Sequence, residues 1–239
     1  NQKVVVEITK WPDKRRNPEG KVVEILGYID EKGTDILSVI KQYQLPLEFP
    51  NKVLDQAERI EEKISEEEIA NRIDLREMKT FTIDGADAKD FDDAVSIEKM
   101  KNGNFKLGVH IADVSHYVTE NSSMDKEALK RGNSVYLVDR VIPMLPEKLS
   151  NGICSLKPGE PRLTLSILME IDNNGKVVNH EIVESVIKSN ERLVYDDISE
   201  LLEKDDENLR VKYNHIYEEL KLMEELCYIL TEKRDNRGS

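Results

Sequence analysis

The stretch that organises this chain reads TFTIDGADAKDFDDAVSI, residues 80–97. Five aspartates fall within residues 84–93, between two runs rich in apolar, β-branched and aromatic residues. Because aspartate disfavours the interior of helices and strands, the pattern predicts a loop between two strands. Such a loop would hold its carboxylates close together, where they repel one another unless a cation neutralises them. Oxygen ligands of this kind suit a hard cation, Mg²⁺ or Mn²⁺, rather than zinc.

Other kinds of acidic loop fit a short motif equally well, among them a plain surface loop, a helix-cap cluster and a structural calcium site. The spacing argues against two specific sites. An EF-hand loop starting at Asp90 would need an oxygen ligand at Ala94 and a glycine at Val95. A phosphatase of the Asp-x-Asp type would place its nucleophile at the end of an apolar strand, whereas Asp90 follows Asp87-Ala88-Lys89.

The length of 239 residues allows one large domain or two smaller ones, and no apolar run approaches the length of a membrane span. The chain starts with Asn1 and shows no signal peptide, which suggests a fragment of a longer protein. Cys154 and Cys227 lie far apart and have no metal-binding spacing, so we expect two reduced thiols. Together these features predict a cytoplasmic protein without a membrane partner.

The formal net charge of −13 argues against a nucleic-acid partner, but the positive charges are not evenly spread. Strands are predicted at 3–8 and 21–29, and the loop between them contains Trp11, Lys14, Arg15 and Arg16. A basic loop with one aromatic residue can contact phosphates and stack on bases. The alternative is an exposed loop whose charges are only solvated.

The rest of the chain alternates between helical and strand patterns. Ser65 and Glu68 form a capping box that predicts a helix start. Ser123 is expected to cap a helix over 124–131 that Gly132 ends. Further elements are predicted as a helix at 51–63 after a proline-containing linker at 44–50, strand hairpins at 92–98 with 105–112 and at 163–171 with 177–187, a strand at 134–138, and a long amphipathic helix at 208–234.

Several long motifs in this chain resemble the ribonuclease II/R (RNB) family, and within it the ribonuclease R branch. The resemblance covers the chain from about Gln2 to its end. It rests on RIDLR (72–76), TIDGADAKDFDDA (82–94), HIADVSHYV (110–118), RGNSVY (131–136) and VIPMLPEKLSNGICSL (141–156). It implies an α+β fold: residues 1–46 as the C-terminal part of a cold-shock (OB) β-barrel, then 47–239 as the first part of a mixed α/β RNB catalytic domain.

The resemblance also implies an activity and its residues. The family consists of hydrolytic, processive, Mg²⁺-dependent 3′→5′ exoribonucleases that release nucleoside 5′-monophosphates from single-stranded RNA. On that basis the catalytic and metal-binding residues are Asp84, Asp90, Asp92 and Asp93, whereas Asp87 matches none of the family's aspartates. Tyr136 and Tyr195 match family tyrosines near the RNA; Tyr136 is placed against the 3′-terminal nucleotide. We expect a monomer that binds the 3′ end of single-stranded RNA and does not act on DNA.

Two other readings stay open. The family completes its site with an arginine and a glutamate from the second half of the catalytic domain, which this sequence does not contain. One alternative is therefore a non-catalytic fragment or relative that binds RNA or metal without cutting. The other is a structural Ca²⁺ or Mg²⁺ site in an acidic α/β protein. The presence of all four matched aspartates favours the enzyme.

Overall fold

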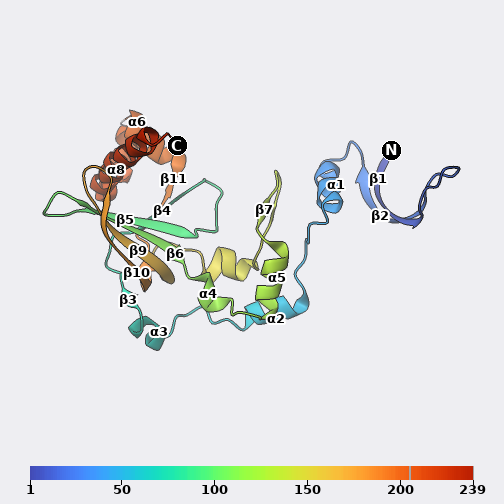
Figure 1. Ribbon diagram of the computed structural model, residues 1–239, viewed down its shortest axis with the longest axis horizontal. Coiled ribbons are helices and arrows are strands. Elements are labelled where there is room, and N and C mark those ends of the chain that lie inside the picture. The colour runs from blue at the N-terminus through green and yellow to red at the C-terminus, as the bar shows by residue number, and fades with distance from the viewer. Residues whose placement is uncertain (205, 239) are drawn as a thin grey trace. The chain divides into compact units, whose positions relative to one another are not determined.

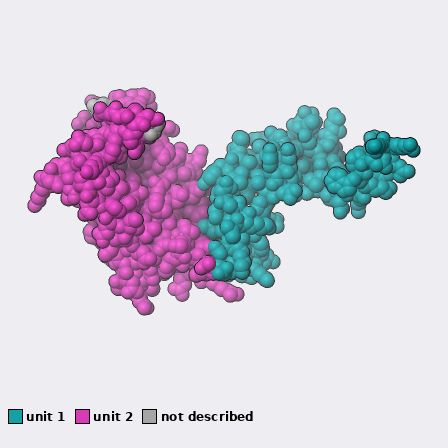
Figure 2. Space-filling model, viewed as in Figure 1, with its two compact units in different colours: residues 1–56, 121–146 teal, residues 57–120, 147–239 magenta. Residues whose placement is uncertain are grey.

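The computed structural model describes residues 1–204 and 206–238. These residues form helices and strands in the order shown in Figure 1 and divide into two compact units, which Figure 2 distinguishes by colour. Unit 1 contains residues 1–56 and 121–146, and unit 2 contains residues 57–120 and 147–239. No helix within the described part of the chain combines the length and the apolar composition that a membrane crossing needs.

The strands predicted at 3–8 and 21–29 form the antiparallel hairpin that begins unit 1, with slightly different bounds, as β1 (Gln2–Lys10) and β2 (Glu19–Tyr28). Register shifts interrupt the pairing at three points, which is where bulges let a ribbon of this kind bend. Helix α1 (Thr34–Gln42) follows and buries Ile40. The hairpin loop is the basic segment that the sequence singles out.

The second half of unit 1 is built around helix α5 (Ser123–Arg131). Its cap is Ser122, whose hydroxyl accepts the Asp125 N–H at 3.1 Å, so the predicted cap at Ser123 is wrong by one residue. Gly132 ends the helix with a φ of 78°, as predicted. At the helix end, the Arg131 guanidinium donates to the carbonyls of Pro46, Glu48 and Pro143 and thereby fixes the proline-containing linker.

Two predicted elements in this region are shorter than the sequence indicates. Helix α2 covers Asn51–Glu58 rather than 51–63, because the Ile60 N–H bonds to the Ala57 carbonyl and tightens the chain into a turn. The strand predicted at 134–138 is reduced to β7 (Val135–Tyr136), which pairs with β8 (Val141–Ile142). A turn bond from the Leu137 N–H to the Arg140 carbonyl ends it.

Unit 2 is organised by a mixed seven-stranded sheet with the order β11-β4-β5-β6-β9-β10-β3. Both predicted hairpins form its centre, and the two outermost pairs, β11 with β4 and β10 with β3, are parallel. The strands are β3 (Ile73–Asp74), β4 (Phe81–Asp84), β5 (Asp93–Lys99), β6 (Phe105–Ala112), β9 (Pro161–Ile171), β10 (Val177–Lys188) and β11 (Glu191–Val194).

Helices cover part of this sheet. The predicted helix over 208–234 is wrong as one element: the chain forms α7 (Glu207–Lys212), a 3₁₀ turn (Asn214–Ile216) and α8 (Tyr217–Asn236). The break lies at Tyr213, whose buried ring packs in the core while its hydroxyl donates to Asp197 Oδ2 at 2.6 Å. The remaining helical elements are α3 (Glu66–Ala70), α4 (Val114–Tyr117), α6 (Tyr195–Lys204) and a π-helical turn (Leu149–Ile153).

The core of unit 2 fastens the strands next to the acidic loop. One cluster joins β4 and β11 to α6 and to the start of α8 through Phe81, Leu193, Ile198, Leu201, Tyr213, Ile216 and Leu220. A second joins β5, β6 and β9 to α8 through Ile97, Phe105, Ile171 and Leu226. Each fully buried side chain of this size contributes about 1.5–3 kcal/mol by leaving water. The strands that flank the acidic loop are therefore a rigid support.

Candidate active site

The acidic loop connects two neighbouring strands, as the sequence predicts. Asp84 is the last residue of β4, and Asp93 is the first residue of β5. Because β4 and β5 are antiparallel, both aspartates lie at the same edge of the sheet. Asp90 and Asp92 belong to the loop itself, where Asp90 is half-buried and Asp92 is exposed.

Two further strands end at this edge. In the parallel pair of β4 and β11, Val194 stands opposite Asp84, so Tyr195 follows directly beyond Asp84. Tyr195 is 60% exposed and begins α6. On the other side, the Ala112 N–H at the end of β6 donates to the Asp92 carbonyl at 2.9 Å. The sheet thus brings Asp84, Asp92, Asp93 and Tyr195 to one edge, although Asp84 and Tyr195 are more than a hundred residues apart in the sequence.

The carboxylates of Asp84 and Asp93 have raised pKa values, so their charged forms are destabilised in the folded chain. Burial is the largest cause that raises the pKa of Asp84, and the charges of Asp93 and Asp92 raise this pKa further. Burial also raises the pKa of Asp93, with the charge of Asp92 as the second cause. The Arg192 guanidinium opposes the rise at Asp84. A positive charge placed among these groups would therefore be stabilised.

One oxygen of this group has no hydrogen-bond donor. Asp84 Oδ2 is buried without a partner among the described residues, and the same holds for the neighbouring hydroxyl of Thr82. Thr82 is close enough to lower the pKa of Asp84, but its geometry does not complete a hydrogen bond. A buried carboxylate oxygen without a donor is a group that a cation would satisfy.

The fit to a metal ion is partial. Across residues 1–204 and 206–238, no three His, Cys, Asp or Glu side chains lie close enough together to hold a metal ion. The carboxylates of Asp84, Asp92 and Asp93 repel one another. The donor set itself, all carboxylate oxygen, suits Mg²⁺ or Mn²⁺.

The other residues assigned to RNA binding lie in unit 1. Tyr136 on β7 is 67% exposed, and Trp11 in the β1–β2 hairpin is 77% exposed. Lys14, Arg15 and Arg16 are also exposed in that hairpin. These five residues therefore belong to unit 1, whereas the four aspartates belong to unit 2.

Two residues beside the loop carry no clear signal in the sequence. Arg192 lies on β11 and reaches the carbonyls of Gly85 and Ala86, both at 2.7 Å. Ser155 approaches the loop from the segment after the π-helical turn. A lone arginine and a lone serine are common in any sequence, and only the parallel pairing of β11 with β4 reveals the first of them. The strand β11 itself is not among the elements that the sequence predicts.

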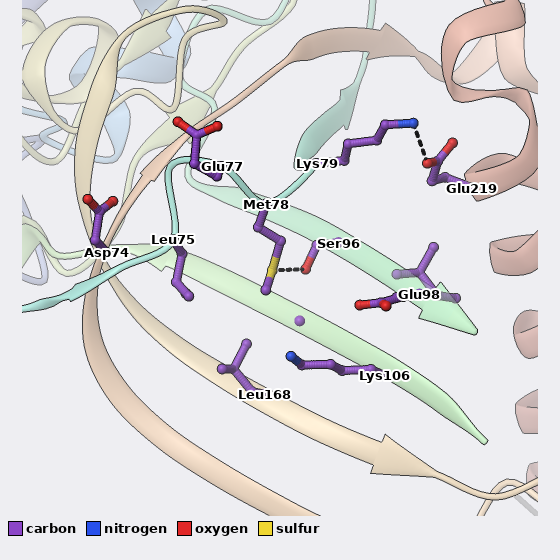
Figure 3. Close-up of a pocket in the computed structure, with 12 residues that line it drawn as sticks. Asp74, Leu75, Glu77, Met78, Lys79, Ser96, Glu98, Lys106, Leu168 and Glu219 are labelled. Carbon is purple, nitrogen blue, oxygen red and sulfur yellow. Dashed lines mark hydrogen bonds and ion pairs between the residues drawn. The ribbon is translucent and has the colours of Figure 1, made fainter. Parts of the chain in front are cut away.

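A cavity of about 440 Å³ lies elsewhere in unit 2. Figure 3 shows Met78 pointing toward Ser96 at one wall and Lys79 paired with Glu219 at another. Residues 74–79, which precede β4, contribute much of the lining, so the cavity lies at the opposite end of β4 from Asp84. None of the residues assigned to catalysis or RNA binding lines it.

Comparison with known proteins gives two family matches. The profile of the RNB domain matches residues 72–239, and that of a cold shock domain matches residues 1–50. Ribonuclease R 1 of Lactococcus lactis is 52% identical over 238 residues, which cover 99% of this chain and 29% of that protein. Ribonuclease R of Thermotoga maritima is 51% identical over 241 residues, covering 100% of this chain and 34% of that protein. The chain thus spans about a third of the length of these relatives.

Solved structures show the same similarity. Mycoplasma genitalium RNase R in complex with double-stranded RNA aligns over 99% of this chain and 42% of its own, with a TM-score of 0.89 and 29% identity. Yeast Ssd1, a pseudonuclease, aligns over 84% of this chain and 26% of its own, with a TM-score of 0.68 and 25% identity. The α+β fold class, with a cold-shock segment followed by an RNB segment, is confirmed by these matches. The exact boundary at residues 46 and 47 stays a prediction.

Proposed function

Because the chain belongs to the ribonuclease II/R (RNB) family of 3′→5′ exoribonucleases, we propose that the protein carrying it hydrolyses single-stranded RNA from the 3′ end. The products would be nucleoside 5′-monophosphates. The observation that carries the proposal is the set of aspartates gathered at the carboxyl end of β4, with the buried, donor-less Asp84 Oδ2 among them. We expect the protein that carries this chain to be a cytoplasmic monomer that acts on RNA and not on DNA.

The catalytic residues of this proposal are Asp84, Asp90, Asp92 and Asp93. The raised pKa values of Asp84 and Asp93 support a role as Mg²⁺ ligands, since their charged forms are destabilised without a cation. Asp84 and Asp93 would be the principal ligands and Asp90 a shared one, while Asp92 would serve a second ion or the terminal ribose hydroxyl. Mn²⁺ is the alternative ion. When bound, such ions lower the pKa of an attacking water and stabilise charge on the phosphate oxygens.

The remaining residues would hold the RNA. Tyr195 and Tyr136 offer exposed aromatic faces on which a base or ribose can stack whatever the sequence. Trp11 would add a further stacking surface, and Lys14, Arg15 and Arg16 would neutralise phosphates. Stacking of this type contributes about 1–3 kcal/mol per base.

The direct test is degradation of a 5′-labelled single-stranded RNA by the complete protein, with Mg²⁺ and with EDTA. The expected result is a ladder of products shortened from the 3′ end that forms with Mg²⁺ and is absent with EDTA. An internal-cleavage pattern, or a ladder that EDTA does not affect, would contradict the proposal. A single-stranded DNA of the same sequence serves as the control and should stay intact.

A second candidate function is RNA binding without cleavage. It is favoured by the similarity to yeast Ssd1, which is a pseudonuclease. Binding of the labelled RNA, measured by fluorescence anisotropy, together with no Mg²⁺-dependent shortening would select this candidate. Cleavage together with binding would select the enzyme.

A further inference from the structure

The loop that carries the aspartates has little structure of its own. Between the end of β4 and the start of β5, the bond from the Ala88 N–H to the Gly85 carbonyl is the internal backbone hydrogen bond that stabilises it. The backbone of residues 85–92 is therefore held mainly by groups outside this stretch. Catalytic groups need to be held to within about 0.5 Å of the productive position.

Ser155 supplies such an external contact on both sides of Asp90. Its hydroxyl donates to the Lys89 carbonyl at 2.8 Å and accepts the Phe91 N–H at 3.1 Å. A single side-chain oxygen therefore fixes the peptide groups immediately before and after Asp90. The next residue adds a third bond, from the Leu156 N–H to the Phe91 carbonyl at 2.7 Å.

Ser155 is itself held rigidly. The residue is fully buried, and its N–H donates to the Gly152 carbonyl at 3.1 Å. Its carbonyl accepts a hydrogen bond from Nε of Arg162 at 2.8 Å, and Arg162 is also buried. Because the serine cannot turn away, its hydroxyl is a fixed reference point for the loop.

Arg192 holds the other half of the loop. Its Nη2 donates to the carbonyls of Gly85 and Ala86, and its guanidinium carbon lies 5.4 Å from the centre of the Phe91 ring. Ser155 and Arg192 thus hold the loop from two different segments: Ser155 follows the π-helical turn, and Arg192 lies on β11. With residues 85–86 held by Arg192, the stretch that remains to be placed is the one around Asp90.

We propose that Ser155 is a positioning residue of Asp90: it holds the backbone on both sides of that aspartate and so sets where the base of its side chain stands. The expected effect on turnover rests on the proposed function. The expected effect on the backbone around Asp90 rests on geometry alone. The competing explanation is a buried serine that merely satisfies two backbone groups and contributes stability. The two explanations differ in what happens to turnover and to local exchange when global stability is kept.

The test compares Ser155→Ala, Ser155→Cys and Ser189→Ala in the complete protein. Ser155→Ala removes both hydrogen bonds, whereas Ser155→Cys replaces the hydroxyl with a somewhat larger thiol that supplies only weak hydrogen bonding. Ser189 is the matched control, because it is equally buried and its hydroxyl donates to the Glu191 carbonyl, away from the loop. Steady-state kinetics on single-stranded RNA, hydrogen exchange of the Phe91 amide and thermal unfolding are measured for each variant.

The expected result is a fall in kcat of about 10–100-fold for Ser155→Ala and Ser155→Cys, with KM changed less than threefold. The Phe91 amide should exchange faster in both, and Ser189→Ala should match the wild type in kcat and in this exchange. If Ser155→Ala is too unstable to purify, Ser155→Cys carries the test, since its thiol leaves no cavity.

Three results would overturn the proposal: an unchanged kcat in Ser155→Ala, an equal loss in Ser189→Ala, or full activity in Ser155→Cys. The last would show that packing rather than hydrogen bonding matters. Failure of the proposed function looks different, since the wild type would then leave RNA intact while the Phe91 amide still exchanged faster in Ser155→Ala.

Discussion

Asp84 and Asp93 sit at a carboxylate-rich edge whose charge is unfavourable for the folded chain without a cation. Burial and neighbouring charges raise both pKa values. A carboxyl whose pKa is higher in the folded than in the unfolded state stabilises the fold at low pH, and this contribution is lost as the pH rises through the folded pKa. At neutral pH these two groups therefore lower the free energy of unfolding.

Neutralising one of these groups should stabilise the metal-free protein. We expect Asp93→Asn to raise the thermal midpoint at pH 7 in EDTA by a few degrees, since 1 kcal/mol corresponds to about 2–4 °C in a domain of this size. Added Mg²⁺ should raise the midpoint of the wild type and have a smaller effect on Asp93→Asn. Calorimetry in EDTA and in Mg²⁺ measures both. A lower midpoint for Asp93→Asn in EDTA would show that the carboxylate is stabilising.

Arg192 combines two roles at this edge, since it fixes two loop carbonyls and opposes the raised pKa of Asp84. Arg192→Gln should lower kcat on RNA about tenfold or more, because the loop carbonyls lose their donor. It should also lower the Mg²⁺ concentration needed for half-maximal activity, because a positive charge that competes with the ion is removed. Arg192→Lys keeps the charge but not the planar fork, so its Mg²⁺ requirement should stay closer to that of the wild type. Mg²⁺ titrations of activity distinguish the variants. Equal Mg²⁺ requirements for Gln, Lys and wild type would refute the electrostatic role.

His110 is a buried neutral group in the centre of the sheet. Its Nε2 contacts Ser96 Oγ at 3.0 Å and its Nδ1 contacts Ser166 Oγ at 2.7 Å. Burial lowers the pKa of His110 to about 4. Because the unfolded state takes up a proton near pH 6.5 and the folded state does not, stability should be complete above pH 6.5 and fall as the pH drops toward 4.

The free energy of unfolding should fall by about 3 kcal/mol at most between pH 8 and pH 4. This figure follows from the difference between the pKa values of His110 in the unfolded and the folded state. Denaturant unfolding between pH 8 and 4 measures it, with His110→Gln as the comparison, because that variant cannot titrate. Its stability should fall less over this interval. Parallel curves for the two proteins would show that His110 is not responsible.

At the scale of the elements, the hydrogen bond between Ser96 and His110 leaves room only for a glycine at position 108 of β6. A Cβ at Gly108 would stand 2.3 Å from Ser96 Oγ and 2.8 Å from His110 Nε2, so no side chain fits beside the hydrogen bond. We expect Gly108→Ala to reduce the free energy of unfolding by about 1–3 kcal/mol. Adding Ser96→Ala should recover part of this loss by removing the clashing hydroxyl. Chemical denaturation of both single variants and the double variant tests this, and strict additivity would contradict it.

The elements differ in how well sequence predicts them, for physical reasons. The strand hairpins and the acidic loop follow from local alternation and from the aversion of aspartate to regular structure. The break between α7 and α8 does not, because Tyr213 fits the helical period and is diverted by a contact with Asp197, sixteen residues away. The pairing of β11 with β4 is equally non-local. The contacts of Arg192 and Ser155 with the acidic loop also join residues far apart in the sequence, so sequence periodicity could not reveal them.

At the scale of the whole molecule, the net charge of −13 and a proposed RNA partner stand in tension. The basic hairpin offers a local solution, since affinity for RNA depends on the cations that meet phosphates rather than on the total charge. Replacing Arg15 and Arg16 by serine should weaken binding of all RNA sequences to a similar degree and make the affinity less dependent on salt. Anisotropy titrations at several salt concentrations measure this. An unchanged salt dependence would remove the hairpin from the RNA-binding surface.

The proposed catalytic role of the aspartates is tested most directly by the turnover of two neighbouring variants of the complete protein, Asp84→Asn and Asp87→Asn, on single-stranded RNA. Each variant removes one charge, and the two positions are three residues apart. Only Asp84 ends β4 with a buried oxygen that has no donor among the described residues, whereas Asp87 is exposed. We predict that Asp84→Asn lowers kcat by roughly 10²-fold or more with RNA binding kept, and that Asp87→Asn stays within about threefold of the wild type. Equal losses in the two variants, or none in Asp84→Asn, would contradict a catalytic role for Asp84.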